Sequence, residues 1–408
     1  MLRVIGNLIE LCARHRGMVL LLYCMLALLA VRSARQVPLD AIPDLSDPQV
    51  IVFTEWRGRS PTLVEDQITY PITSALLAAP KVEAVRGYSM FGMSFVYVLF
   101  AEDVDVYWAR SRVQEYMSGI QSRLPEAVTP SLGPDATGVG WVFEYALVDR
   151  SGQHDLAELR AIQDFSLRYA LESVPGVAQV ASVGGFEKQY QVQLDPDRLR
   201  AYGLTVAEVG EVIRRGNAEV GGRVLELGGR EAFIRGRGYL RGEADLGDLV
   251  VRTNPDGTPL RIADIGTVRL GPEIRRGLAE LDGQGEAVGA IVIARYDTDV
   301  LDVIERVKSR LATLDAGLPE GVEVVPTYDR SALIHRSVAT LGHALLEEGI
   351  VVALVIILFL LHLRSALLPI LSLPLAVLLA FIPMAWLGIP ATIMSLGGIA
   401  IAVGATVD

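Results

Sequence analysis

Long apolar runs near both ends of the chain enclose a long polar middle. The runs cover Gly17–Val31, Gly349–Leu363 and Ala366–Gly388, and a fourth extends from Ala391 to Asp408. About 20 mostly apolar residues are needed to cross roughly 30 Å of hydrocarbon. With a few flanking residues added, the pattern predicts transmembrane helices over 17–35, 337–364, 365–389 and 390–408, the last of them truncated.

Charges around these runs predict the orientation. In residues 1–16, Val4, Leu8 and Leu11 share one helical face, which is typical of an amphipathic helix lying in the membrane plane. Arg14 and Arg16 favour a cytoplasmic N-terminus, and Arg364 favours a cytoplasmic turn after the second run. These two assignments are consistent with each other if the polar middle lies outside the cytoplasm. The first run could instead be a signal peptide, since "VRSA" resembles a cleavage site.

The polar middle alternates between strand and helix patterns. "PQVIVFTEWRG" and "WVFEYALVD" read as strands, "VYWARSRVQEYMSGIQSRL" as a helix, and "PKVEAV" resembles "PGVAQV" farther on. We expect two β-α-β-β-α-β (split βαβ) subdomains, so the fold class is an α+β membrane protein. The first covers 36–136, the second covers 137–185 and 274–336, and an insert with its own helix and hairpin covers 186–273.

Composition and motifs exclude several classes of protein. The net charge of −11 argues against nucleic-acid binding, which needs a basic surface. Cys12 and Cys24 are the two cysteines, so no disulfide framework is possible, and we expect both to pack in the membrane. The five histidines are scattered and form no ligand pair in the sequence. "GPDATGVG" lacks the Gly-Lys-Ser/Thr ending of a nucleotide loop, and no catalytic triad or paired-acid pattern suggests an enzyme.

Asp408 is the strongest functional candidate. A carboxylate within hydrocarbon is costly, and such residues usually line a bundle interior or a proton path. Gly397 and Gly404 precede it on the same helical face, where small residues let another helix approach closely. The alternative is that the span ends here and that Asp408 is an interfacial cap.

Methionine thioethers are the second candidate chemistry, because they suit soft Cu(I) and Ag(I). Met394 stands at the mouth of the fourth span, where core packing and metal binding are both open. Met90 and Met93, in "SMFGMS", lie at a strand–turn–strand, and there we expect packing.

Four stretches resemble a known family. They are "VPLDAIPDLSDPQVIV", "LGPDATGVGWVFEYALVD", "YDRS" and "MSLGGIAIAVGATVD", and together they resemble the heavy-metal efflux branch of the resistance–nodulation–division (RND) transporters, in particular its copper/silver pumps. The resemblance implies the N-terminal half of an inner-membrane, multi-pass homotrimer with a large periplasmic domain. It implies a periplasmic adaptor protein and an outer-membrane channel as partners, Asp408 as the proton relay, and 186–273 as a docking subdomain.

The residue at 402 bears on the substrate. Zinc/cobalt-type members of the branch carry a second aspartate there, whereas this chain has Ala402, as copper/silver members do. Ile274 and Thr406 depart from the copper/silver pattern, since methionine would fit a stepwise thioether path at both positions. The implied function is proton-driven efflux of Cu(I) or Ag(I), with no resident cofactor.

Three alternatives remain at this stage. The protein could be an RND exporter of divalent metals or hydrophobic drugs. It could be a SecD-like accessory of protein translocation, which shares a periplasmic domain and a proton-linked span. It could also be a truncated product that cannot transport by itself.

Overall fold

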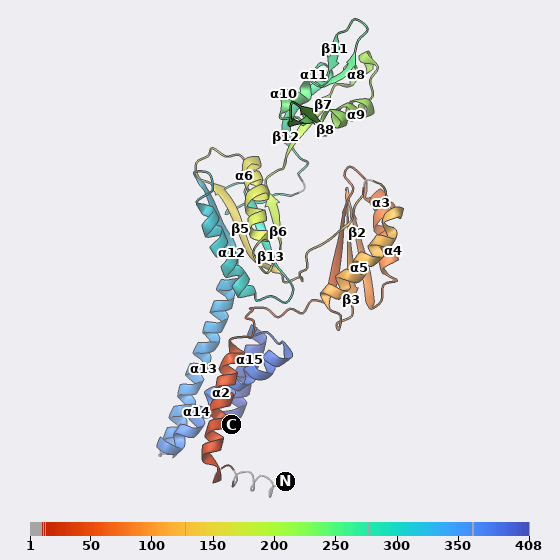
Figure 1. Ribbon diagram of the computed structural model, residues 1–408. Helices are drawn as coiled ribbons and strands as arrows, with labels where there is room; N and C mark the ends of the chain where they lie inside the picture. Colours follow the sequence, from red (N-terminus) through yellow and green to blue (C-terminus); the bar gives the residue numbers. More distant parts are fainter. Residues whose placement is uncertain are drawn as a thin grey trace. The chain divides into compact units, whose positions relative to one another are not determined.

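The computed structural model describes residues 10, 12, 14–126, 128–275, 277–360 and 363–407. The chain forms two compact units. The first comprises residues 1–152, 163–183 and 289–408, and the second comprises residues 153–162 and 184–288 (Figure 1).

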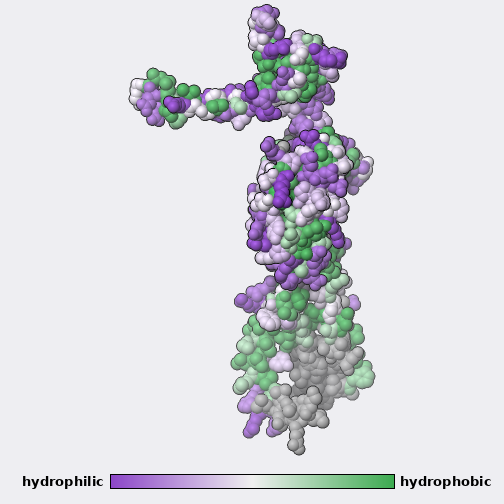
Figure 2. All heavy atoms as spheres, turned by 90° about the vertical axis from the view of Figure 1, so that its right-hand side faces the viewer, coloured by the Kyte–Doolittle hydropathy of each residue, from purple (hydrophilic) through white to green (hydrophobic). Residues whose placement is uncertain are grey.

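Helix α2 (Arg16–Ala34) covers the first predicted span. By length and composition it is the one helix among the described residues that could cross a membrane. The other three predicted spans fall in α13 (Arg330–Leu360), α14 (Leu363–Leu387) and α15 (Ile393–Val407). Figure 2 shows apolar side chains gathered over the helical part that contains α2, whereas hydrophilic side chains dominate the parts that carry sheets.

The described apolar segments of α13 and α14 are shorter than a full span, at Gly349–Phe359 and Pro374–Leu387. The amphipathic helix predicted over 1–16 falls almost entirely outside the described residues. Helix α2 packs along α14, and α13 contacts both α14 and α15.

Helix α13 begins at Arg330, directly after a strand and ahead of the transmembrane segment predicted from residue 337. Asp329 Oδ1 accepts a hydrogen bond from the backbone N–H of Ser331 at 2.9 Å, as a helix-capping carboxylate does. The first turns of α13 are therefore helical although no apolar run marks them.

The first sheet has the strand order β2-β3-β1-β4. Its strands are β1 (Gln49–Glu55), β2 (Val82–Met90), β3 (Met93–Phe100) and β4 (Ser131–Leu132). Its helical segments are α3 (Pro61–Val64), the π-helical η1 (Glu65–Thr69), α4 (Tyr70–Leu76), α5 (Val106–Ile120) and the short η2 (Gln121–Arg123).

Alternation along β3 produces one buried face, with Val96, Val98 and Phe100 packed against the helices. Ser60 accepts from the backbone N–H of Leu63 and is followed by Pro61, so both features expected at the start of a helix are present. Asp105 caps α5 in the same way through the N–H of Trp108.

The second sheet has the strand order β14-β5-β13-β6. Its strands are β5 (Trp141–Asp149), β6 (Val177–Gly184), β13 (Val288–Ala294) and β14 (Val322–Asp329). The helical segments in the same stretch of chain are α6 (Leu156–Ile162), the π-helical η3 (Gln163–Leu167), α7 (Arg168–Glu172) and α12 (Val300–Asp315). In both sheets the first and third strands in chain order are central and the second and fourth are at the edges, as in a split βαβ unit.

The segment between β6 and β13 forms its own small core. Strands β7 (Lys188–Leu194) and β12 (Gly266–Pro272) pair antiparallel over their full length. The remaining elements are α8 (Pro196–Tyr202), α9 (Val206–Gly216), β8 (Val220–Leu227), β9 (Arg230–Gly236), α10 (Glu243–Gly247), β10 (Val250–Thr253), β11 (Pro259–Arg261) and α11 (Ile262–Ile265).

Strands β8 and β9 form the predicted hairpin. Every residue in both strands is exposed. Gly228 and Gly229 form its turn with φ of +59° and +77°, the left-handed region that a two-residue hairpin turn uses.

Gly184 and Gly185 stand where the chain leaves β6, and both have positive φ, +72° and +61°. A Cβ on Gly184 would collide with the carbonyl oxygen of Ala287, and one on Gly185 would lie 2.9 Å from that of Leu156. Only glycine meets both constraints, which explains the "GG" at this point of the sequence.

Candidate functional site at the start of helix α15

The predicted proton relay, Asp408, lies outside the described residues. Gly404 falls within α15, whose described part ends at Val407. A Cβ built on Gly397 would meet no atom of the described residues within 4 Å. The close helix approach expected at Gly397 is therefore not made by the described helices of this chain.

The first turn of α15 is fixed by a reciprocal cap. The Thr392 N–H donates to Ser395 Oγ at 2.8 Å, and the Ser395 N–H donates to Thr392 Oγ1 at 3.3 Å. Ser395 Oγ also donates to the carbonyl oxygen of Pro390 at 2.9 Å. This is the capping-box arrangement with serine in the usual place of an acid.

Met394 lies within this capped turn, and its side chain is 68% exposed. Of the two roles that the sequence leaves open, core packing is therefore not made with the described residues. Its thioether is available to a soft ion, but one thioether does not make a site by itself.

The backbone just before α15 pairs with the segment that follows α2. The Ala391 N–H donates to the carbonyl of Pro38 at 2.9 Å, and the Asp40 N–H donates to that of Ala391 at 3.2 Å. The Ile393 N–H donates to the carbonyl of Ala41 at 3.3 Å. An apolar cluster of Val37, Met384, Ala391 and Leu396 holds the two segments against the end of α14.

A buried ion pair adds α13 to this arrangement. Arg330 Nη1, in the first turn of α13, lies 3.4 Å from Asp40 Oδ2, and the two side chains are 4% and 17% exposed. Burial raises the pKa of Asp40, and the attraction of Arg330 offsets part of that rise. Arg330 Nε is buried and has no hydrogen-bond partner among the described residues, which costs stability at this point.

A second ion pair connects the start of α13 to α12. Lys308 Nζ lies 2.7 Å from Asp329 Oδ2 and 2.7 Å from Ser331 Oγ. Burial alone would raise the pKa of Asp329, but hydrogen bonds from Lys308 and Ser331 outweigh it and hold the pKa below its ordinary value. We call Asp40, Lys308, Asp329, Arg330 and Ala391 the junction.

Sequence reasoning did not single out the junction residues as functional. The signal was present, because Asp40 lies in "VPLDAIPD" and Arg330 in "YDRS", two of the stretches that carry the family resemblance. What the sequence could not show is that these stretches meet.

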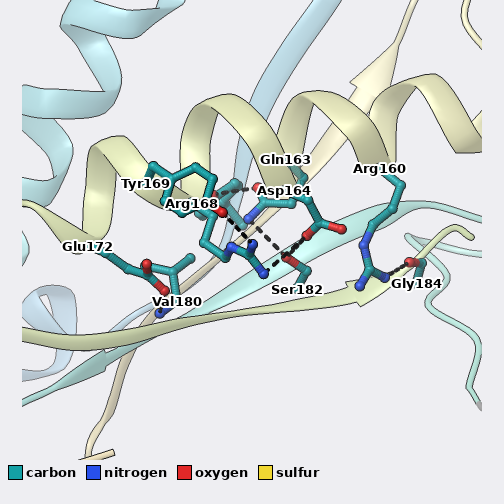
Figure 3. A network of polar contacts seen from close by, with 10 residues as sticks. Arg160, Gln163, Asp164, Arg168, Tyr169, Glu172, Val180, Ser182 and Gly184 are labelled. Atoms are coloured by element: carbon teal, nitrogen blue, oxygen red, sulfur yellow. Dashed lines mark hydrogen bonds and ion pairs between the residues drawn. The ribbon is translucent and has the colours of Figure 1, made fainter. Parts of the chain in front are cut away.

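A buried polar network lies between η3 and β6. Gln163 and Asp164 are almost fully buried, and Ser182 Oγ donates to Asp164 Oδ1 at 2.5 Å. Tyr145, whose hydroxyl donates to Gln163 Oε1 at 2.7 Å, completes the set. Figure 3 shows Gln163, Asp164 and Ser182 turned toward one another between the helix and the strand. π-Helical turns of this kind often mark functional sites.

The first sheet has a related network. Thr69, at the end of η1, lies 2.7 Å from Ser94 Oγ and accepts from Ser89 Oγ at 2.8 Å. If "PKVEAV" is aligned with "PGVAQV", Thr69 falls on Asp164 and Gly87 on Ser182. A Cβ on Gly87 would lie 2.5 Å from Thr69 Cγ2, so the two repeats place different side chains at the same two packed positions.

Met90 lines a hollow of about 700 Å³ on the open face of the first sheet, with Arg86, Tyr88 and Phe95 among its neighbours. Met90 is 50% exposed, so it is not part of the core of this sheet. Met93, across the turn, is half-buried. No group of three or more His, Cys, Asp or Glu side chains suited to a metal ion occurs in the described part of the chain.

Known proteins resemble this chain over nearly its whole length. The family model described as the AcrB/AcrD/AcrF family matches residues 8–408. Cation efflux system protein CusA of Escherichia coli (strain K12) is 54% identical over 371 residues, which cover 91% of this chain and 35% of that protein. The putative cation efflux system protein SilA of Salmonella typhimurium is 53% identical over 371 residues, which likewise cover 91% of this chain and 35% of that protein.

A more distant relative is the cobalt-zinc-cadmium resistance protein CzcA of Cupriavidus metallidurans, 34% identical over 96% of this chain and 37% of that protein. A crystal structure of a heavy metal efflux pump superposes with a TM-score of 0.86 at 34% identity, covering 96% of this chain and 39% of that one. The chain spans about a third of the length of the CusA and SilA proteins. The match of family, sequence and structure shows that the chain belongs to the AcrB/AcrD/AcrF family, the resistance–nodulation–division transporters.

Proposed function

We propose that the chain is part of an inner-membrane pump that exports monovalent heavy-metal cations, Cu(I) and Ag(I), in exchange for protons. The observation that carries this proposal is the 54% identity with cation efflux system protein CusA over 91% of the chain. Identity falls to 34% with CzcA, named for cobalt, zinc and cadmium, and to 29% with CnrA, named for nickel and cobalt. That fall supports a substrate outside the divalent class.

Individual residues support the same ion class. Position 402 is alanine in this chain, whereas zinc/cobalt-type members of the branch carry a second aspartate there. The exposed thioether of Met394 suits a soft monovalent ion at the mouth of α15. Asp408 is the proposed proton relay, because a carboxylate within hydrocarbon can load and release a proton as its surroundings change.

The junction offers a route by which such a proton cycle could reach the sheets. A movement of α15 would displace Ala391, and through it the backbone of Asp40. Asp40 holds Arg330 at the start of α13, and α13 continues directly from β14. On this view the pump is a secondary transporter, and its chemistry is binding and proton transfer, without covalent catalysis.

The remaining parts fit a three-part envelope assembly. Residues 36–136 would be the first porter subdomain, and residues 137–185 and 274–336 the second. Residues 186–273 would be the docking subdomain, and the full exposure of β8 and β9 supports a hairpin that reaches a neighbouring subunit of a homotrimer. A periplasmic adaptor and an outer-membrane channel would complete the path across the envelope.

Transport by the complete pump polypeptide in inverted membrane vesicles tests the proposal. We expect uptake of Ag(I) that requires a proton gradient and is abolished by Asp408→Asn. Asp47→Asn is the matched control, because Asp47 is exposed outside the membrane helices. Uptake of Zn(II) or of a hydrophobic drug in place of Ag(I), or full Ag(I) uptake by Asp408→Asn, would overturn it.

A further inference from the structure

The contact between Asp40 and Arg330 is a loose one for a buried ion pair. Arg330 Nη1 lies 3.4 Å from Asp40 Oδ2, and Arg330 Nε is buried without a hydrogen-bond partner among the described residues. Charge-assisted hydrogen bonds are usually about 2.7–2.9 Å long, and arginine often makes two of them to one carboxylate. By contrast, Lys308 of α12 lies 2.7 Å from both Asp329 Oδ2 and Ser331 Oγ. The start of α13 is therefore bound tightly to α12 and loosely to Asp40.

The two carboxylate oxygens of Asp40 have different partners. Oδ1 accepts a short hydrogen bond of 2.6 Å from the backbone N–H of Ala41. Oδ2 is the oxygen that faces Arg330. A proton that joins the carboxylate therefore goes to Oδ2, the less engaged oxygen, and occupies the position from which Arg330 is bound. Protonation of Asp40 and its ion pair with Arg330 compete for the same atom.

The surroundings of Asp40 favour uptake of that proton. Burial raises the pKa of Asp40, the attraction of Arg330 and backbone hydrogen bonds lower it only in part, and repulsion from the exposed Asp44 raises it further. Lys308 and Asp329, the other charges of the junction, are paired with each other. The segment between α14 and α15 carries no charge. Asp40 thus takes up a proton at a higher pH than an exposed aspartate does.

Loss of the charge on Asp40 leaves Arg330 without its counter-ion. The side chain of Arg330 is 4% exposed, and a buried unpaired charge is strongly destabilising. The guanidinium should therefore turn out toward water. The same movement frees the start of α13 from the segment that follows α2.

We propose that Asp40 and Arg330 form a latch that a proton releases. While Asp40 is ionised, the latch joins the segment after α2 to the start of α13, and when Asp40 Oδ2 binds a proton, Arg330 leaves it. The predicted orientation places the latch at the outer ends of the membrane helices, the side from which protons enter in the proposed function. A role of the latch in transport rests on the proposed function, whereas its release by a proton does not.

Modification of arginines by phenylglyoxal in the complete pump polypeptide, followed by mass spectrometry, tests the position of Arg330 directly. At about pH 8, Arg330 should be protected in the original sequence and should react about tenfold faster or more in Asp40→Asn, whose neutral oxygen accepts a weaker hydrogen bond. Asp44→Asn is the matched control, because Asp44 lies in the same segment and only repels Asp40, so Arg330 should stay protected. Equal rates at Arg330 in the two variants would overturn the latch.

Arg336 serves as the internal reference for this measurement. It lies on α13 and is exposed, so its rate of modification should be the same in every variant. An unchanged rate at Arg336, together with identical size-exclusion profiles, shows that the variants are folded.

A fluorine label tests release in a protein that keeps Asp40. Ala332 is exposed in the first turn of α13, so Ala332→Cys can carry a trifluoromethyl group once Cys12 and Cys24 are replaced by serine. We expect a second fluorine resonance that grows as pH falls. Asp44→Asn should move this transition to lower pH, because it removes a repulsion that raises the pKa of Asp40. A spectrum that does not change with pH, or that changes equally in Asp40→Asn, would contradict the latch.

Uptake of Ag(I) by the same variants separates the latch from the proposed function. Release of Arg330 in Asp40→Asn together with slower uptake supports a role in transport. Protection of Arg330 in Asp40→Asn, with normal uptake, overturns the latch and leaves the function standing. Release of Arg330 in a pump that carries no Ag(I) leaves the latch standing and overturns the function.

Discussion

The guanidinium of Arg330 lies 3.4 Å from the carboxylate of Asp40, although the two residues are 290 positions apart in the chain. Asp40 follows α2, and Arg330 begins α13. The backbone of Asp40 is also hydrogen-bonded to Ala391 before α15. The ion pair and this backbone hydrogen bond together connect the segment after α2, the start of α13 and the segment before α15.

Removal of Asp40 should be costly because it leaves Arg330 buried without its partner. We expect Asp40→Ala to lower stability by about 3 kcal/mol, the usual cost of breaking a buried pair. Asp40→Asn should cost less, since its amide oxygen still accepts a hydrogen bond. The stability of both variants is measured as the midpoint of thermal unfolding of the purified protein. Asp47→Ala, at an exposed position, should change it little, and an equal loss in all three would refute the role of the pair.

The pH dependence of Asp40 has a definite sign. Its pKa is raised above the ordinary 3.8 because burial outweighs the attraction of Arg330. The folded protein therefore binds this proton more tightly than the unfolded chain does. The stabilisation that the proton provides is lost as pH rises through the folded pKa. Asp40→Asn should flatten the pH profile of the unfolding midpoint above pH 4, and an unchanged profile would contradict the shift.

Asp329, which pairs with Lys308, should respond to pH in the opposite sense to Asp40. Burial is the largest single influence on both groups, but it is outweighed by their mutual hydrogen bond and attraction together with hydrogen bonds from Ser331 to Asp329 and from Lys308 to Glu305. The pKa of Asp329 therefore lies below 3.8 and that of Lys308 above 10.5. The stabilisation from Asp329 is lost only as pH falls below 3.8, and that from Lys308 only as pH rises above 10.5. We expect Lys308→Met to lower stability by about 1 kcal/mol, equally across neutral pH.

Lys81 provides the matched control for Lys308. Its ammonium lies the same 2.7 Å from Asp103, but the side chains are 50% and 71% exposed. Water screens that pair, so Lys81→Met should leave the unfolding midpoint nearly unchanged. Equal losses of stability in the two lysine variants would show that burial does not strengthen the pair of Lys308 and Asp329.

Two buried threonines, Thr54 in β1 and Thr69 in η1, should respond oppositely to the same substitution by valine. Thr54 Oγ1 is buried and has no hydrogen-bond partner among the described residues, so Thr54→Val should raise stability by about 1 kcal/mol. Thr69 Oγ1 contacts Ser89 and Ser94, so Thr69→Val should lower stability by about 1–2 kcal/mol. Opposite shifts of the unfolding midpoint are expected, and shifts of the same sign would contradict the hydrogen-bond assignment.

The network around η3 can be tested through Tyr145. Burial raises the pKa of Tyr145, and its hydroxyl donates to Gln163, which is fully buried. Tyr145→Phe should cost about 1–2 kcal/mol, because it leaves Gln163 Oε1 without this donor. Tyr107→Phe removes a longer hydrogen bond, 3.3 Å to Asp135, from a side chain that is 46% exposed, and should cost much less. Comparable losses in the two variants would show that burial of the network adds nothing.

Local pattern determined the elements of the polar middle. "WVFEYALVD" is β5 from its first residue to its last, and "TVAEVGEVIRRG" is the cap and body of α9. These signals are carried by neighbours in the chain: alternation with a period of two for strands, and a capping residue before a helical period. The likeness of "PKVEAV" to "PGVAQV" likewise marks the corresponding strands β2 and β6.

What the sequence determined by itself was this succession of strands and helices, the apolar character of α2 and the family resemblance. The tertiary structure alone decided that Asp40 meets Arg330 and that Lys308 meets Asp329. It also decided that α13 begins at Arg330, where a cap and not an apolar run starts the helix. The reason is physical: periodicity records which face of an element is buried, whereas an ion pair between distant segments depends on where folding brings their backbones together.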